Sequence, residues 1–313
     1  MRLSIITINY NNAEGLRKTL ASVASQTYRN IEHIIVDGAS TDGSVDVIKE
    51  YVTANSLNAN SLNVTWLSET DTGIYNAMNK GIEIVLGRRI VNPNHTSSPN
   101  SLNTHSLNES QCDYLQFLNS GDVLAAPDVT ERMIDALESL NTQRSTLNAQ
   151  PIDILYGNML KFRENGESFV DTCGATDTIT LNMFYRGCLN HSPAYIKRAL
   201  FDVYGLYDET LKICSDWKFY MQSIVLGKAQ VHYVDITVTH FDMNGISETR
   251  KDILNEERNR LLHELVPAGI LADYDRYHIP MSQYDRLKRH HLWPLVYFIE
   301  RVLFKLEKWH ILR

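Results

Sequence analysis

Polar side chains stand at the ends of two apolar segments near the N-terminus. Thr7, Asn9 and Tyr10 close the segment that begins at Leu3, and Asp37 follows the second segment. Such side chains can hydrogen-bond a ligand. An ionised carboxylate, which only accepts hydrogen bonds, suits a base edge that offers an N–H donor. Ligands of open α/β sheets bind at the carboxyl ends of the strands, so we expect a binding site where these two segments end.

The residues around these ends predict a strand–helix–strand unit. Leu3 to Ile8 is a mostly apolar, β-branched run that suits a strand buried on both faces, and Ile31 to Val36 is a second one. Between them, apolar residues recur at helical spacing over Glu14 to Gln26, which predicts an amphipathic helix packed on a sheet. A connection of this length joins parallel strands.

The rest of the chain continues this alternation. Further strands are expected over residues 64–68, 113–118, 152–156 and 231–237. Further helices are expected over residues 44–51, 75–85, 127–140, 199–204 and 217–226. A hairpin is expected around Asn165-Gly166. Alternating strands and helices indicate an α/β protein with a doubly wound, mostly parallel sheet flanked by helices.

The composition is that of a soluble globular protein, with 313 residues, 43% hydrophobic and 21% charged. A formal net charge of -7 gives no indication of nucleic-acid binding. The four cysteines form no CxxC pair, so we expect reduced thiols in a cytoplasmic protein. We expect no signal peptide, because the N-terminus enters a strand at once, and no membrane-spanning helix, because no run of about 18 apolar residues exists.

Two segments of low complexity interrupt the predicted elements. Residues 53–63 and 91–110 each contain the unit Ser-Leu-Asn twice, at a five-residue step. Two tandem copies are too few for a solenoid, and the segments are too polar to form a core. We expect surface loops inserted between core elements.

Four motifs follow one another along the chain: SIITINYN, HIIVDGASTDGS, SETDTGIYNAMNKG and FLNSGD. Their sequences and order resemble the family 2 glycosyltransferases of the GT-A fold, and the resemblance covers residues 1–250. It implies a nucleotide-sugar-dependent enzyme of the type that builds bacterial surface polysaccharides. Residues 1–125 would form the nucleotide-sugar-binding half and residues 126–250 the acceptor half, followed by a helical extension over 251–313.

At the binding site expected where the first two strands end, the resemblance implies that Asp37 accepts hydrogen bonds from a nucleotide base, usually uracil. Thr7, Asn9 and Tyr10 would be its companions. Considered without the resemblance, Asp37 and Asp42 shape an Asp-Gly turn and cap the following helix.

The third motif adds Asp71, Gly73 and Lys80 to the expected nucleotide site. In the family, the aspartate and the glycine form a loop close to the nucleotide, and backbone approaches a phosphate or ribose closely only where a side chain is absent. Free N–H groups at the start of the helix 75–85 favour a diphosphate. The alternative is that Asp71 caps this helix and that Lys80 lies on its solvated face.

The segment Asn119-Ser120-Gly121-Asp122 stands where the family carries its metal-binding DxD motif. There a divalent Mn or Mg ion bridges the donor's phosphates, and carboxylate oxygens suit such hard cations. Asn119 and Gly121 replace two aspartates of the family pattern, which leaves Asp122 as the charged ligand; His240 is a further candidate. Magnesium often uses only one or two protein carboxylates. Without the resemblance, the segment is an ordinary turn.

Asp216 stands at the start of the predicted helix 217–226, where inverting members of the family carry an acidic residue. The resemblance implies that its carboxylate removes the proton from the attacking hydroxyl, which requires hydrogen-bond reach to that hydroxyl. The alternative is that Asp216 caps the helix, and both roles can coexist. His191 also matches a recurrent family position, although a lone histidine is as often structural.

The C-terminal residues 285–313 carry seven Lys or Arg and three acidic residues, interleaved with aromatic and aliphatic ones. Such a segment can lie on an anionic membrane surface, dock on the catalytic domain or form a dimer contact. Lipid-linked acceptors, common in the resembling family, favour a peripheral position on the inner face of the cytoplasmic membrane.

The sequence therefore predicts an inverting glycosyltransferase that moves a sugar from a nucleoside-diphosphate donor, of the UDP-sugar class, to a saccharide or lipid-linked acceptor. A second hypothesis is a non-catalytic nucleotide-sugar-binding subunit of an assembly complex, favoured by the substitutions in the metal motif. A dinucleotide-dependent oxidoreductase is disfavoured, because Asn9 to Gly15 stands where GxGxxG would follow the first strand.

Overall fold

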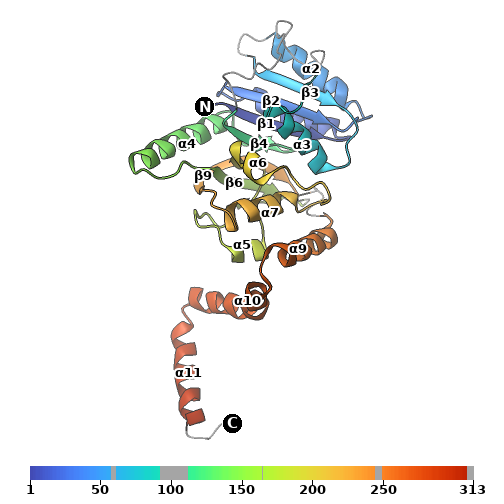
Figure 1. The fold of residues 1–313 in the computed structure, drawn as a ribbon. Helices are drawn as coiled ribbons and strands as arrows, with labels where there is room; N and C mark the ends of the chain where they lie inside the picture. The colour runs from blue at the N-terminus through green and yellow to red at the C-terminus, as the bar shows by residue number, and fades with distance from the viewer. Residues whose placement is uncertain (58–60, 92–111, 164, 244–248, 309–313) are drawn as a thin grey trace. The chain divides into compact units, whose positions relative to one another are not determined.

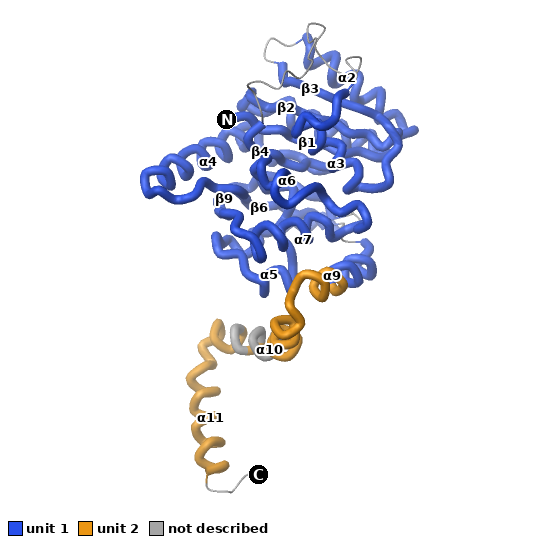
Figure 2. Tube along the Cα trace, in the orientation of Figure 1, with its two compact units in different colours: residues 1–258 blue, residues 259–313 orange. Residues whose placement is uncertain are grey.

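The computed structural model describes residues 1–57, 61–91, 112–163, 165–243 and 249–308 (Figure 1). Nearly all of the predicted insertion at 91–110 lies outside the described residues. The chain divides into two compact units, residues 1–258 and 259–313 (Figure 2). The predicted boundary after residue 250 therefore lies inside the first unit.

The N-terminal half is a parallel sheet in the order β3-β2-β1-β4. Its strands are β1 (Leu3–Asn9), β2 (Ile31–Asp37), β3 (Asn63–Ser68) and β4 (Tyr114–Phe117), and they alternate with the helices α1 (Ala13–Ala24), α2 (Ser44–Ser56) and α3 (Ile74–Val85). Asn9 pairs with Asp37, and Asp37 with Ser68, so three carboxyl ends lie side by side. The predicted strand–helix–strand unit is confirmed.

The second half of the sheet mixes strand directions. It contains β8 (Ala194–Lys197), β6 (Ile154–Phe162), β9 (Val231–Asp242) and β5 (Val123–Leu124), with β7 (Ser168–Asp171) as the hairpin partner of β6. β8 is antiparallel to β4 and β6, whereas β6 and β9 are parallel. The predicted α/β class is confirmed, and the antiparallel pairs are an addition to it.

The helices of the second half are α4 (Val129–Thr146), α5 (Leu181–Arg186), α6 (Ala199–Tyr204), α7 (Ser215–Tyr220) and α9 (Lys251–Leu265), followed by α10 (Ala268–Arg289) and α11 (Trp293–Lys308). The helix predicted over 217–226 is instead α7 and a π-helical turn, η2 (Met221–Val225). Residues 53–56, predicted as loop, belong to α2. Asn55 bonds both backbone groups of Leu62 there, which ties the helix end to the segment before β3.

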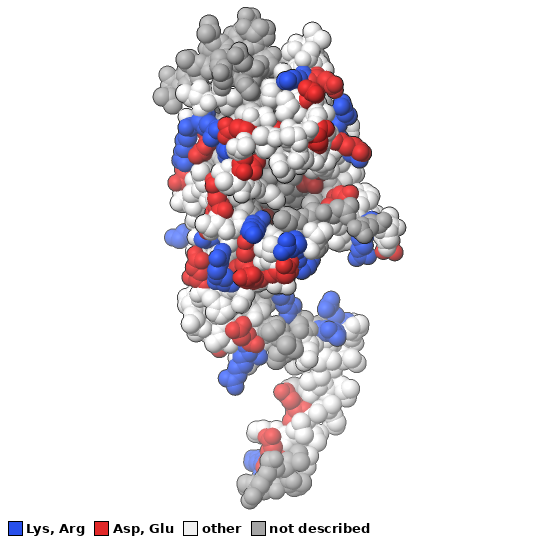
Figure 3. Space-filling view, turned by 90° about the vertical axis from the view of Figure 1, so that its right-hand side faces the viewer, with Lys and Arg blue, Asp and Glu red and all other residues white. Residues whose placement is uncertain are grey.

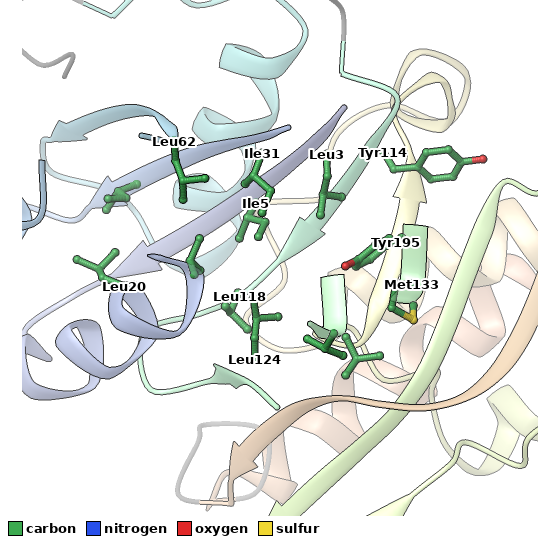
Figure 4. Close-up of a cluster of buried hydrophobic side chains, with 14 of the residues drawn as sticks. Leu3, Ile5, Leu20, Ile31, Leu62, Tyr114, Leu118, Leu124, Met133 and Tyr195 are labelled. Carbon is green, nitrogen blue, oxygen red and sulfur yellow. The ribbon is translucent and has the colours of Figure 1, made fainter. Parts of the chain in front are cut away.

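Successive side chains of β1 point to opposite faces of the sheet, one covered by α1 and the other by α3. Leu3 and Ile5 lie in a buried cluster with Leu16 and Leu20 of α1 (Figure 4). Ile6 meets α3 at Gly81, where a Cβ atom would stand 2.5 Å from Ile6 Cγ2. Glycine therefore allows α3 to approach the sheet closely, and this contact fixes the position of α3 on β1.

A buried histidine lies inside the parallel sheet. His33 of β2 is fully buried, with Nε2 3.0 Å from Thr7 Oγ1 and Nδ1 2.9 Å from the Tyr51 hydroxyl. Burial lowers the pKa of His33 to about 3. The ring is therefore neutral in the folded protein over the physiological pH range.

His33 should make the fold sensitive to acid. Below its ordinary pKa of 6.5, the unfolded chain binds a proton that the folded protein excludes until the pH approaches 3. The stabilisation is thus complete above pH 6.5 and is lost as the pH falls. From pH 7 to pH 5, the free energy of unfolding should fall by about 2 kcal/mol more in the native protein than in His33→Gln. Urea denaturation at both pH values measures this, and equal losses would contradict it.

Candidate active site

The carboxylate of Asp37 joins the ends of three strands. It is fully buried and accepts hydrogen bonds from Asn9 Nδ2 (2.8 Å), Ser40 Oγ (2.6 Å), Ser68 Oγ (2.6 Å) and the backbone N–H of Ser40. Asn9 ends β1, Asp37 ends β2 and Ser68 ends β3. Both carboxylate oxygens are thus engaged within the protein. Asp37 holds together the sheet edge at which the nucleotide was expected.

Tyr10 and Asp71 form the accessible part of this edge. The Tyr10 side chain is 67% exposed, and Asp71 is half-buried. Asp71 Oδ1 accepts a hydrogen bond from the Gly73 N–H (3.0 Å), and a Cβ atom at Gly38 would lie 2.5 Å from Asp71 Oδ2. Gly73 has a φ of 141°, which favours glycine. The structure thus brings Tyr10, Asp71 and Gly73 together beside the end of β2.

Thr7 and Lys80, which were also predicted to bind the nucleotide, are buried in the protein and are not part of the accessible sheet edge. The Thr7 side chain is fully buried against His33. Lys80 is buried as well, and its Nζ donates to the Thr70 carbonyl (2.7 Å) and lies 2.9 Å from Glu69 Oε1. A buried ammonium group needs such partners, because an unpaired buried charge is strongly destabilising. Lys80 is therefore not on a solvated face, and it braces the loop that carries Asp71.

The segment 119–122 is held by α1. The hydroxyl of Thr19 accepts a hydrogen bond from the Gly121 N–H (2.9 Å) and donates to the Asp122 carbonyl (2.7 Å). Asn12, whose side chain caps α1, donates to the Ser120 carbonyl (3.1 Å). Gly121 has a φ of 107°, in the left-handed region. Sequence reasoning missed Asn12 and Thr19, because they bond backbone atoms about a hundred residues away.

Asp122 is buried beside another acid. It is 6% exposed, and burial together with the charge of Asp242 raises its pKa to about 8. Asn119 Oδ1 is buried and has no hydrogen-bond partner among the described residues. His240 pairs with Val123, so the β5–β9 ladder places it across from the residue after Asp122.

These groups fit a partial metal site. A divalent cation would stabilise the charged form of Asp122 and give Asn119 Oδ1 a partner, and oxygen ligands suit Mn or Mg. Across the described residues, no group of three or more His, Cys, Asp and Glu side chains is arranged to hold an ion. A metal held by Asp122 and Asn119 would therefore complete its coordination with water and substrate oxygens.

A cavity of about 530 Å³ brings together residues from distant parts of the sequence. Four of the predicted site residues line it: Asn119, Asp122, His191 and Asp216. Other lining comes from α3, β6, the segment 186–192 and α9. The cluster around Asp37 and Asp71 lies outside this lining.

Tyr75 orients Asp216. Its hydroxyl lies 3.0 Å from Asp216 Oδ1 and also donates towards the Ile213 carbonyl oxygen, and the Trp217 N–H donates to the same Asp216 oxygen (2.8 Å). Burial, together with the charge of Asp216, raises the pKa of Tyr75 well above its usual range, so the hydroxyl remains a donor. Sequence reasoning missed this role, although Tyr75 stands inside the third motif.

His191 belongs to an aromatic cluster at the cavity wall. Its ring stacks on Phe117 with 4.6 Å between ring centres, and its Nε2 lies 2.8 Å from the Tyr207 hydroxyl. Burial lowers the pKa of His191, although the charge of Asp216 opposes the shift. The neutral ring is thus a packing group with one side at the cavity.

Residues 4–94 match the family model described as Glycosyl transferase family 2. Named relatives extend over most of the chain. An uncharacterized glycosyltransferase of Mycobacterium tuberculosis is 27% identical over 252 residues, which are 80% of this chain and 78% of the relative. A PGL/p-HBAD biosynthesis glycosyltransferase of Mycobacterium bovis is 24% identical over 256 residues, which are 80% of each chain.

Solved structures share the fold. Residues 1–349 of S. aureus TarS superpose with a TM-score of 0.54 at 18% identity, covering 84% of this chain and 72% of that one. The mannosyltransferase PcManGT from Pyrobaculum calidifontis gives a TM-score of 0.52 at 14% identity, covering 77% and 56%. These likenesses confirm the GT-A fold. The family match, the relatives and the fold together show that the chain is a glycosyltransferase enzyme with a family 2 region at residues 4–94.

Proposed function

We propose that this enzyme moves a sugar from a nucleoside-diphosphate donor to an acceptor hydroxyl with inversion at the anomeric carbon. The observation that carries the proposal is that Asp122 and Asp216 line one cavity of about 530 Å³, a size that accommodates a small ligand. The acceptor oxygen bonds to the anomeric carbon while the bond from that carbon to the diphosphate oxygen breaks. The hydroxyl proton passes to Asp216, and the diphosphate leaves with the bonding electrons.

The base of the donor lies at the edge that Asp37 holds together. The exposed Tyr10 ring offers a stacking face, and the Asp71 carboxylate accepts from an N–H group, which fits uracil. Solved structures of the same fold contain UDP or UDP-GlcNAc bound to S. aureus TarS, and GDP-Man with Mn2+ bound to PcManGT. We therefore take a UDP-sugar as the donor class.

The diphosphate lies between this edge and the cavity. Asp122 and Asn119, with His240 beside them, would hold a Mn or Mg ion there. Such an ion, when bound, acts as a Lewis acid that stabilises the leaving diphosphate. The backbone N–H groups that begin α3 after Gly73 favour the same negative charge.

The acceptor enters at Asp216, and we propose that it is a saccharide or a lipid-linked saccharide. The non-catalytic alternative depends on the substitutions at Asn119 and Gly121. The contact between Tyr75 and Asp216 favours the enzyme, because it orients a carboxylate at the cavity wall that a binding subunit would not need.

The second unit supports a contact with the inner face of the cytoplasmic membrane. No residue of α11 is buried, and its exposed side chains include Phe298 (64% exposed) and Val302 (40%), four residues apart on one face. Arg301, Lys305 and Lys308 stand beside this face. An amphipathic helix of this composition binds anionic lipid surfaces. Among the described residues, no helix is both long and apolar enough to cross a membrane.

Asp216→Asn should lower kcat by about 10²- to 10⁴-fold, because the general base is lost. Tyr75→Phe should lower it by about tenfold, because Asp216 loses an orienting donor. Tyr51→Phe, which removes a half-buried hydroxyl outside the cavity lining, is the matched control and should retain activity. UDP release from a panel of UDP-sugars with saccharide acceptors measures the rates. Full turnover by Asp216→Asn would refute the assignment of the base.

UDP should raise the melting temperature of the protein, and Mn or Mg should enlarge the shift, because ligands of the folded state stabilise it by mass action. Asp122→Asn should remove the metal-dependent part, and Asp71→Asn should reduce the whole shift. Asp128→Asn, at an exposed position, is the control. A UDP shift in the native protein that does not respond to metal would contradict the metal site.

The full chain should cosediment with phosphatidylglycerol vesicles and bind phosphatidylcholine vesicles weakly, since the face combines apolar and basic residues. Phe298→Ser with Val302→Ser should abolish binding. Val203→Ser removes an apolar side chain from α6 that is more exposed (71%) than either of these, and it should have no effect. Binding that survives in the double variant would place the membrane contact elsewhere.

A further inference from the structure

Glu257 of α9 is a buried acidic residue that lies beyond the four sequence motifs. On the molecular face drawn in Figure 3, acidic and basic side chains are interspersed at the surface. Glu257 differs from such surface acids, because only 8% of it is exposed. A carboxylate removed from water is stable only where hydrogen-bond donors surround it. The identity of these donors therefore shows what Glu257 holds in place.

The donors are three consecutive backbone N–H groups. Glu257 Oε1 accepts from Lys212 (2.6 Å), and Oε2 accepts from Ile213 (2.9 Å) and Cys214 (3.0 Å). The Cys214 thiol also donates to the Leu254 carbonyl (3.5 Å), which is a second contact between this segment and α9. Because one carboxylate binds three successive peptide groups, the backbone of residues 212–214 is fixed to the side chain of Glu257.

This segment leads directly to Asp216. Cys214 is the N-cap of α7, and Asp216 is the second residue of that helix. Ile213 is held on both sides, since its N–H donates to Glu257 and its carbonyl oxygen accepts from the Tyr75 hydroxyl. The same hydroxyl lies 3.0 Å from Asp216 Oδ1. Glu257 and Tyr75 therefore hold the chain before Asp216 from two different helices.

Glu257 is not one of the residues that line the cavity, whereas Ile213, Cys214 and Asp216 are. It can therefore affect the reaction only through the segment that it holds. A misplacement of a reacting group by about 1 Å can cost about 10²-fold in rate, even where the change lies far from the chemistry.

We propose that Glu257 is a positioning residue for Asp216. By fixing the backbone of residues 212–214, it sets the distance between the Asp216 carboxylate and the acceptor hydroxyl. The inference rests on the proposed function, because it takes Asp216 as the general base. It assigns to α9, which follows the predicted catalytic region 1–250, a part in the reaction.

Glu257→Gln replaces one acceptor oxygen by an amide group that cannot accept, so at least one backbone N–H loses its partner. The kcat should fall by about 10- to 100-fold, as expected for the loss of a hydrogen bond to a charged group. The KM for the UDP-sugar and the melting shift produced by UDP should remain within about twofold of the native values. Glu256→Gln, exposed on the same helix, is the matched control and should retain native kcat. UDP release measures the rates.

A double-mutant cycle separates positioning from a general loss of stability. In Asp216→Asn there is no base to position, so Glu257→Gln should not lower the residual rate further. A loss of stability would lower the rate in both backgrounds. All rates are measured at a temperature at which the melting curves show each variant to be folded. If Glu257→Gln does not fold, Glu257→Asp, which keeps the carboxylate on a shorter side chain, takes its place in the cycle.

Hydrogen–deuterium exchange tests the anchor without turnover. The amide hydrogens of residues 212–214 should exchange faster in Glu257→Gln than in the native protein, because their acceptor is impaired, and at the native rate in Glu256→Gln.

Two outcomes would overturn the inference: a native kcat in Glu257→Gln, or an equal loss of rate in the native and Asp216→Asn backgrounds. A native protein that releases no UDP from any sugar donor would instead refute the proposed function. In that case, faster exchange in Glu257→Gln would show that the anchor exists but serves another purpose.

Discussion

The buried carboxylate of Asp37 is the interaction on which the carboxyl edge of the parallel sheet depends. A charge removed from water in this way persists only when donors surround it, and Asn9, Ser40 and Ser68 supply them from three neighbouring segments. The loop after β2 is thereby fixed, and it places Asp42 where its carboxylate accepts the N–H groups of Ala13 (2.8 Å) and Ser44 (3.1 Å). The contacts of Asp37 and Asp42 thus link the ends of the strands to the first residues of α1 and α2.

The helix α3 extends this order to the other half of the molecule. It begins at Gly73, beside Asp71, contributes Tyr75 to the orientation of Asp216, and packs on β1 through Gly81. One helix therefore connects the sheet edge at Asp37 and Asp71 with the cavity at Asp216. Helix α1 has a similar effect on the segment 119–122 through Thr19, so both ends of the expected diphosphate position are fixed by helices packed on the parallel sheet.

The strands and helices of the parallel half of the sheet could be predicted, because the sequence patterns that indicate them lie within short segments of the chain. Apolar periodicity identified β1, α1 and β2, and the alignment of parallel strands then placed Asn9 and Asp37 at one edge. What remained hidden depends on long separations. Tyr75 and Asp216 are 141 residues apart, and Glu257 meets Cys214 from a helix beyond the recognised motifs. The direction of β8 and the burial of Thr7 and Lys80 also follow from tertiary packing, which no spacing rule expresses.

The backbone at Gly121 limits how the proposed metal-binding segment, residues 119–122, can change. With a φ of 107°, this position holds a conformation that L side chains rarely adopt, and its N–H is engaged by Thr19. Restoring the missing aspartate there would strain the turn that presents Asp122. Asn119 differs from aspartate only at its terminal atoms, and its Oδ1 has no hydrogen-bond partner in the part of the chain that the structure describes. If the proposed metal binds here, an aspartate at position 119 is therefore the change that would strengthen its site, because the backbone conformation at position 121 disfavours any side chain.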